Sequence, residues 1–173
     1  MLPIFLTGLM ASGKTTVGRR LAARTSATFV DLDERVERMF GRSVGELFAI
    51  GEPTFRACEH VAFTSLLAEP AFAARDVVVA TGGGLVVDAR HRTAMADVGR
   101  VVWLHVPLDE LARRLAETQA TRPLLAGAPA HERLAALARE RGDAYRDRAI
   151  EIDATGDPDA VVERVLAALG GTA

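Results

Sequence analysis

Short, mainly apolar runs alternate with longer amphipathic stretches along most of the chain. Five runs have the length and composition of strands buried in a parallel sheet, and they cover residues 3–6, 28–30, 77–80, 101–106 and 149–152. The stretches between and after them carry apolar residues at helical spacing. They predict helices over about residues 14–24, 33–40, 43–50, 53–68, 88–97, 107–117, 131–147 and 158–169.

This alternation predicts one α/β domain over residues 1–173. Consecutive strand–helix–strand units are right-handed and build a parallel sheet with helices on both faces. We therefore expect a three-layer α/β/α fold with a central five-stranded parallel sheet. Ligands of such sheets bind at the carboxyl ends of the strands, so we expect the binding and catalytic residues in the loops that follow the strands.

The second and third predicted helices carry local signals of their own. The helix over 33–40 places Val36, Met39 and Phe40 on one side, which we expect to face the core. Ser43 and Glu46 have the spacing of a capping box, in which each side chain accepts a hydrogen bond from the backbone of the other residue. A separate helix should therefore begin at this point.

Residues 8–15 read Gly-Leu-Met-Ala-Ser-Gly-Lys-Thr and match the phosphate-binding pattern G-x-x-x-x-G-K-[ST] between a predicted strand and a predicted helix. Glycines let backbone N–H groups wrap an anion, and the helix N-terminus adds positive partial charge. Lys14 would reach the β- and γ-phosphates of a nucleotide, and Thr15 would ligate Mg²⁺. The alternative, a glycine-rich turn with a surface lysine, fits poorly because Lys14 is the one lysine among 21 lysine and arginine residues. The predicted ATP-binding residues of this P-loop are Gly8, Ala11, Ser12, Gly13, Lys14, Thr15 and Thr16.

Asp31 and Asp33 follow the second predicted strand and lie on one side of an extended segment. One carboxylate could hold magnesium, directly or through water, and the other could accept a hydrogen bond from a hydroxyl nucleophile. The alternative is structural, because Asp33 is also well placed to cap the helix over 33–40.

Arg56 and Glu59 are three residues apart on one predicted helix face. They form either an exposed ion pair worth about 0.5 kcal/mol or an arginine held rigid to bind a substrate carboxylate. The triple glycine 82–84 follows an apolar strand and would let a ligand approach the backbone, or it is a flexible turn. It does not fit the dinucleotide pattern G-x-G-x-x-G, because residue 87 is valine.

Residues 118–130 are rich in Thr, Pro, Ala and Gly and predict a mobile loop. Arg122 in this loop is either solvated or the arginine of a lid that closes over ATP phosphates. Most of the four arginines of the following helical region should face solvent, namely Arg139, Arg141, Arg146 and Arg148.

Composition narrows the classes of protein. A net charge of −2 and a pI of about 6.1 argue against a non-specific nucleic-acid binder. Cys58 is the single cysteine, so neither an internal disulfide nor a cysteine metal cluster is expected. The apolar runs fall short of the ~20 residues of a membrane span, and residues 1–6 do not look like a signal peptide. We expect a cytoplasmic location and no membrane partner.

Taken in order, these motifs resemble one family. G-L-M-A-S-G-K-T-T, D-L-D, G-E-P-T-F-R-A-C-E, T-G-G-G and R-P-L-L, followed by Arg141 and Tyr145, resemble the shikimate kinases from Leu6 to about Ala149. The resemblance implies a P-loop fold of the nucleoside-monophosphate-kinase type with a substrate-binding helical region over about 33–60 and a lid over about 113–127. It implies transfer of phosphate from MgATP to the 3-hydroxyl of shikimate, on the route to chorismate and the aromatic amino acids, and we expect a monomer.

The resemblance also implies roles for particular residues. Asp33 would contact the reacting hydroxyl, and Lys14 and Arg122 would act on the transferred phosphate. Thr15 would ligate Mg²⁺, with Asp31 behind it. The shikimate-binding residues would be Asp33, Arg56, Glu59, Gly82, Gly83, Gly84 and Arg141, of which Glu59 would orient Arg56.

The sequence departs from the common pattern of this family at two places, and three other functions remain as alternatives. Residues 154–158 lack the basic residue that many members carry near adenine, and Met10-Ala11 replaces the commoner glycine- or proline-containing versions of the P-loop. The rivals are a gluconate kinase, a GTP-dependent switch and a non-catalytic paralogue. Asp153-x-x-Gly156 fits a D-x-x-G pattern, but the chain has no asparagine and so no N-K-x-D guanine motif.

Overall fold

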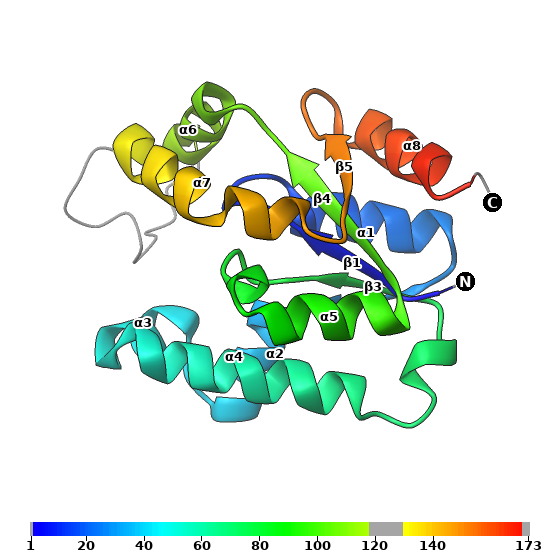
Figure 1. Ribbon diagram of the computed structural model, residues 1–173, viewed down its shortest axis with the longest axis horizontal. Helices are drawn as coiled ribbons and strands as arrows, with labels where there is room; N and C mark the ends of the chain where they lie inside the picture. The colour runs from blue at the N-terminus through cyan, green and yellow to red at the C-terminus, as the bar shows by residue number, and fades with distance from the viewer. Residues whose placement is uncertain (1, 118–129, 171–173) are drawn as a thin grey trace.

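The computed structural model describes residues 2–117 and 130–170, and these form one parallel five-stranded sheet with helices around it (Figure 1). The strand order is β2-β3-β1-β4-β5, and every neighbouring pair is parallel. The strands are β1 (Ile4–Thr7), β2 (Thr28–Asp31), β3 (Val77–Ala80), β4 (Arg100–His105) and β5 (Ile150–Asp153). The predicted sheet is therefore confirmed, because a run such as Val77–Ala80, buried at all four positions, has no polar face to offer solvent.

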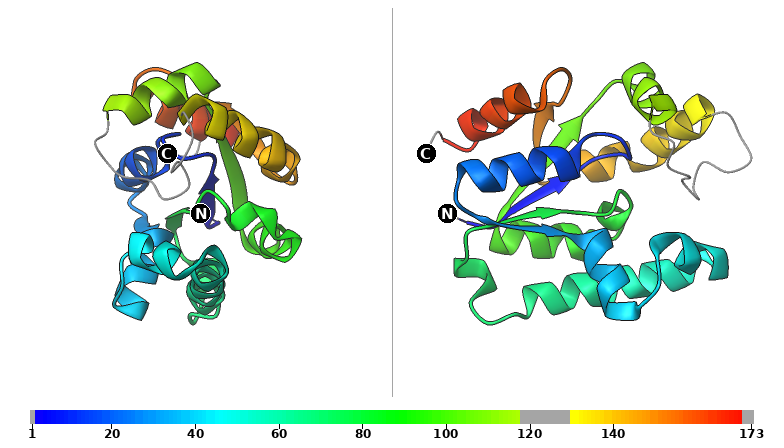
Figure 2. Two further views of the ribbon diagram at one scale, coloured as in Figure 1. Left: turned by 90° about the vertical axis from the view of Figure 1, so that its left-hand side faces the viewer. Right: turned by 180° about the vertical axis from the view of Figure 1, so that it is seen from behind.

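Helices cover both faces of the sheet and its β2 edge. The α-helices are α1 (Lys14–Arg24), α2 (Leu32–Phe40), α3 (Val44–Ile50), α4 (Glu52–Leu67), α5 (Ala89–Val98), α6 (Leu108–Glu117), α7 (Ala130–Arg146) and α8 (Pro158–Ala168), with short 3₁₀ turns η1 (Phe72–Ala74) and η2 (Leu85–Val87). Seen end-on, α1 and α5 lie on opposite sides of the sheet, and α2 to α4 form a separate lobe below it (Figure 2). This arrangement leaves the carboxyl ends of β1, β2 and β3 open toward that lobe.

The core is built where the sheet meets its helices. Phe5 on β1 is fully buried and packs edge-on against Phe63 of α4 and at a tilt against Phe72. Contacts of this kind add to area burial by about 0.5–1.5 kcal/mol each. The three rings therefore join the central strand to the α4 lobe.

Two predictions about α2 are corrected. Asp31, not Asp33, caps this helix, because its Oδ1 accepts the backbone N–H of Asp33 at 3.0 Å and of Glu34 at 3.4 Å. Val36 is fully buried as predicted, but Met39 and Phe40 remain 43% and 38% exposed, so the buried face of α2 ends before its last turn. The predicted capping box at Ser43 and Glu46 is confirmed at the start of α3.

No helix within residues 2–117 and 130–170 is long and apolar enough to span a membrane. The segment proposed as a lid is described only in part. Its first five residues, 113–117, form the last turn of α6, and residues 118–127, with Arg122, lie outside the described residues.

Candidate active site

The P-loop connects β1 to α1 and leaves backbone N–H groups pointing at one spot. Gly13 is the N-cap of α1 in the left-handed conformation (φ 95°), and no side chain caps the helix. The first N–H groups of α1 therefore have no intrahelical acceptor, and a helix N-terminus in this state binds anions. Lys14 folds back over the loop, and its Nζ donates to the carbonyls of Gly8 and Leu9 at 2.9 Å each. The ammonium is thus held at the mouth of the anion site.

Ala11 has a strained backbone within this loop. Its φ is +62°, a left-handed conformation that costs a residue with a Cβ about 1–2 kcal/mol. This is one of the two positions at which the sequence departs from the commoner glycine- or proline-containing loops. The loop therefore keeps the shape that wraps a phosphate at a cost to stability.

Thr15 and Asp31 form an oxygen pair beside the anion site. Thr15 Oγ1 donates to Asp31 Oδ2 at 2.7 Å, while Oδ1 of the same carboxylate caps α2. Hard oxygen donors suit Mg²⁺, which commonly takes one or two protein ligands together with phosphates and water. Within the described residues no cluster of three or more His, Cys, Asp or Glu side chains could hold a metal by itself. The donor set therefore fits magnesium that arrives with a nucleotide.

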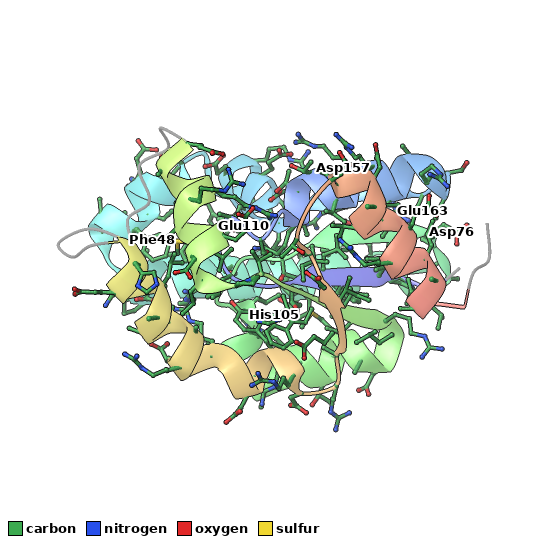
Figure 3. All side chains as sticks on the ribbon, turned by 90° about the horizontal axis from the view of Figure 1, so that it is seen from above. Phe48, Asp76, His105, Glu110, Asp157 and Glu163 are labelled. Atoms are coloured by element: carbon green, nitrogen blue, oxygen red, sulfur yellow. The ribbon has the colours of Figure 1, made fainter. Side chains whose placement is uncertain are left out.

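The anion site opens into a cleft of about 570 Å³. Besides the P-loop, its lining includes Asp33, Arg114 and Pro158. Arg114 Nη2 donates to Ala154 O at 3.1 Å and Nε to Glu110 at 2.8 Å, so the guanidinium joins α6 to the loop after β5. Glu110 extends from α6 on this side of the molecule (Figure 3). Arg114 was not predicted as a site residue, because nothing in the local sequence distinguishes it from Arg113, the surface arginine beside it on α6.

Arg56 is held by two carboxylates of its own helix. Nη1 donates to Glu59 Oε2 at 2.7 Å, and Nη2 donates to Glu52 Oε1 at 3.0 Å. Burial alone would lower the pKa of Arg56, but the charges and hydrogen bonds of Glu59 and Glu52 raise it. Because the Glu59 side chain is only 2% exposed, this is not the surface ion pair that the sequence left open.

The triple glycine packs directly against these side chains. A Cβ on Gly84 would lie 2.3 Å from the Arg56 guanidinium, and a Cβ on Gly82 would lie 2.1 Å from Glu59 Oε1 and 3.2 Å from Asp33 Oδ1. Any side chain at these two positions would displace the charged groups. The glycines therefore allow this close packing, in a turn that lies against charged side chains.

Glu59 is buried next to a second carboxylate. Burial raises the pKa of Glu59, Asp33 raises it further, and Arg56 partly offsets both. Glu59 Oε1 is buried and accepts no hydrogen bond from the described residues, while Oε2 is bound by Arg56. The site thus presents a desolvated acceptor oxygen close to Gly82 and Asp33.

Two side chains of α7 hold the middle glycine. Arg141 Nη1 donates to Gly83 O at 3.3 Å, and the hydroxyl of Tyr145 donates to the same carbonyl. Arg141 is only 4% exposed, so it is the exception among the arginines that were expected to face solvent. Tyr145 stacks on Trp103, and burial raises its pKa, which keeps the hydroxyl protonated as a donor. The sequence analysis gave Tyr145 no role, because the contact spans 62 residues.

The two halves of the site meet between the P-loop and the triple glycine. A Cβ on Gly83 would lie 3.4 Å from Gly8 O. Asp33 lines the P-loop cleft and also faces Gly82, whereas Arg56, Glu59, Gly84 and Arg141 line a neighbouring cleft of about 710 Å³. The predicted residues outside 118–129 therefore lie together at one rim of the sheet, as expected from the strand order.

A parallel sheet of this order, with a phosphate-binding loop after β1 and an arginine-lined cleft beside it, defines a P-loop kinase of the nucleoside-monophosphate-kinase type. Comparison with known proteins gives the family. The shikimate kinase family model matches residues 10–170, and the chain belongs to this family.

Relatives and solved structures agree with this assignment. The chain is 42% identical to a shikimate kinase of Gloeobacter violaceus over 96% of this chain and 91% of the relative, and 44% identical to one of Synechococcus elongatus over 95% and 85%. A crystal structure of shikimate kinase from Bacteroides thetaiotaomicron superposes with a TM-score of 0.87 at 31% identity and covers 97% of this chain and 98% of its own. One from Acinetobacter baumannii has the same TM-score and identity and covers 99% of this chain and 95% of its own. The second is a complex with shikimate. A gluconokinase of Sinorhizobium meliloti, at 20% identity and a TM-score of 0.65 over 96% of this chain and 90% of its own, shares the fold.

Proposed function

We propose that this protein transfers the γ-phosphoryl group of MgATP to the 3-hydroxyl of shikimate. The observation that carries the proposal is the position of Asp33, which lines the phosphate-binding cleft and lies beside Gly82 and Glu59, next to the cleft that Arg56 and Arg141 line. The chain belongs to the shikimate kinase family, and a structure with the same fold is a complex with shikimate, which supports this choice of acceptor.

The carboxylate of shikimate would lie between Arg56 and Arg141. Both guanidiniums border one cleft, and Glu59 holds Arg56 so that its planar fork is already oriented. Bidentate binding of a carboxylate by a fixed arginine is stronger and more directional than binding by a point charge. The backbone of Gly82–Gly84 would contact the ring hydroxyls, since these three residues have no side chain of their own that would block a ligand.

Phosphoryl transfer would take place beside Asp33. The 3-hydroxyl oxygen attacks the γ-phosphorus, the bond to the β–γ bridging oxygen breaks, and the hydroxyl proton passes to the Asp33 carboxylate while ADP leaves. Lys14 and the N–H groups of the P-loop bind the phosphates and offset the charge of a loose transition state. Magnesium, held by Thr15 and by Asp31 through water, would supply further neutralising charge on the phosphates.

The nucleoside would extend from the P-loop toward Arg114 and Pro158, which line the rest of that cleft. The planar guanidinium of Arg114 offers a surface for stacking on the base. Arg122 would close on the phosphates as part of a lid, and we propose a cytoplasmic, monomeric enzyme with residues 33–60 as its acceptor-binding region.

A coupled assay of ADP release tests this function. Under MgATP we expect turnover with shikimate, and background rates with gluconate or with no acceptor. Lys14→Met should abolish turnover while thermal unfolding stays unchanged. Equal turnover with gluconate would reduce the assignment to a small-metabolite kinase, and an active Lys14→Met variant would contradict the P-loop role.

A further inference from the structure

A pair of histidines joins α4 to the segment that follows the triple glycine. His60 Nδ1 lies 2.8 Å from His91 Nε2, and His91 Nδ1 lies 3.2 Å from Leu85 O. His60 comes one turn after Arg56 on α4, while Leu85 directly follows Gly84. The two imidazoles therefore connect the helix that carries the clamp to the loop against which the clamp packs.

The direction of these hydrogen bonds follows from the acceptor at one end. A backbone carbonyl can only accept, so His91 Nδ1 carries a proton and donates to Leu85 O. Burial lowers the pKa of His91, which favours the neutral ring, and Nε2 is then an acceptor. The proton between the rings thus belongs to His60 Nδ1. The result is a one-way chain from His60 through His91 to Leu85.

His91 is a rigid middle member of this chain. It is 7% exposed, and its ring packs edge-on against Phe63 at a centroid distance of 5.0 Å. The next residue, Arg92, donates Nη1 to Val86 O at 2.7 Å and Val87 O at 3.1 Å. Three consecutive carbonyls after the triple glycine are therefore held by two neighbouring residues of α5.

Among the described residues, the His60–His91 contact is the one hydrogen bond between α4 and residues 82–98. The other contacts across this gap are the edge-on packing of Phe63 on the His91 ring and the close approaches of Arg56 to Gly84 and of Glu59 to Gly82. Packing contacts of this kind set a minimum distance between α4 and the triple-glycine loop, but they do not prevent a larger distance. A hydrogen bond through two stiff rings limits the separation in both directions.

We infer that the His60–His91 bridge is a positioning device, which fixes α4 against the triple-glycine loop and thereby sets the width of the acceptor side of the cleft. The inference rests on the proposed function, because it assigns shikimate to that cleft. Neither histidine needs to touch the substrate. Loss of the bridge should let Arg56 and Gly84 separate and weaken acceptor binding, while the P-loop, which makes no hydrogen bond to either histidine, is unaffected.

Steady-state kinetics of matched variants test the bridge. His60→Phe keeps an aromatic ring but removes the donor, and His60→Asn replaces it with an amide N–H at the position of Nδ1. His60→Phe should raise the KM for shikimate about 3- to 10-fold, the range for one lost hydrogen bond, and leave the KM for MgATP unchanged, with a fall in melting temperature of about 2–4 °C at most. His60→Asn should restore most of the shikimate KM. His105→Phe, which removes another half-exposed histidine at the end of β4 (Figure 3), is the control and should change neither KM.

Nitrogen-15 NMR of the histidine rings gives a second, independent readout. Wild type should show His91 as the Nδ1–H tautomer with Nε2 as an acceptor. An Nε2–H tautomer, an unchanged shikimate KM in His60→Phe, or equal rises in both KM values would overturn the inference while the proposed function stands. Wild-type enzyme without shikimate-dependent turnover would overturn the proposed function and this inference with it.

Discussion

At the residue scale, the proposed recognition of the acceptor depends most directly on Arg56. Its guanidinium is bound by Glu52 and Glu59 and rests on the backbone of Gly84. These contacts fix the fork before a substrate arrives, so little side-chain entropy is lost on binding. A lysine at this position could supply the charge but could not reproduce two parallel hydrogen bonds.

Arg56→Lys should therefore weaken shikimate binding by about 1.5–3 kcal/mol, the scale of a hydrogen bond to a charged group. The measured effect is a rise of about 10- to 100-fold in the KM for shikimate with little change in the KM for MgATP. Arg19→Lys, at an exposed ion pair with Glu34, is the matched control and should leave both values as they are. Wild-type shikimate kinetics in Arg56→Lys would remove the carboxylate clamp from the mechanism.

Ala11 offers a test of backbone strain at the same scale. Ala11→Gly relieves a left-handed residue with a Cβ but gives the unfolded chain more freedom, and the two effects leave a net gain of about 0.5–1 kcal/mol. We expect a slightly higher melting temperature and an unchanged KM for MgATP. A lower melting temperature would show that the Ala11 methyl group makes packing contacts that outweigh its strain.

At the scale of elements, α2 is capped by a residue that we also propose for the magnesium site. One Asp31 oxygen caps the helix, and the other accepts a hydrogen bond from Thr15. The helix start and the P-loop are thus fixed to each other through a single side chain. The capping box at Ser43 is purely structural by comparison, since it lies on an exposed turn.

Asp31→Asn and Ser43→Ala should therefore separate capping from metal binding. Asparagine caps helices as well as aspartate, so Asp31→Asn should keep its stability while the Mg²⁺ concentration for half-maximal activity rises. Ser43→Ala should lose about 1 kcal/mol of unfolding free energy with an unchanged Mg²⁺ dependence. Denaturant titration and magnesium titration of both variants measure these effects. A loss of stability in Asp31→Asn with an unchanged Mg²⁺ dependence would assign Asp31 to structure alone.

At the scale of the whole molecule, the parallel sheet brings together loops that are far apart in the chain. The carboxyl ends of β1, β2 and β3 supply the P-loop, Asp31 and the triple glycine, and α4 and α7 close the site from two sides (Figures 1 and 2). Burial between these elements places Glu59 beside Asp33 and Arg141. The titration of Glu59 is therefore a property of the assembled site.

Acidification should weaken acceptor binding through Glu59. Burial raises its pKa, so the carboxylate is protonated at a higher pH than an exposed glutamate, and protonation releases Arg56. The KM for shikimate should rise as pH falls through this raised pKa and should be constant above it. In Glu59→Gln the KM for shikimate should be moderately raised, and it should not change over this pH range. A step at the same pH in Glu59→Gln would assign the titration to another group.

The sequence alone determined what depends on neighbouring residues. The P-loop, the strands and the capping box at Ser43 each occupy one short stretch, and the period of apolar positions decides which face is buried. The resemblance to shikimate kinases located Arg56, Glu59 and the triple glycine, because these residues lie in continuous motifs.

Tertiary structure decided what depends on distance across the chain. Tertiary packing makes Asp31 the cap in place of Asp33, and it buries Arg141, which helical spacing alone did not distinguish from the other arginines of α7. It also brought Tyr145 to Gly83, 62 residues away, and His60 to His91, 31 residues away. A periodic pattern states only that a residue faces inward, whereas its partner is set by how the sheet and its helices pack, and that packing involves the whole chain at once.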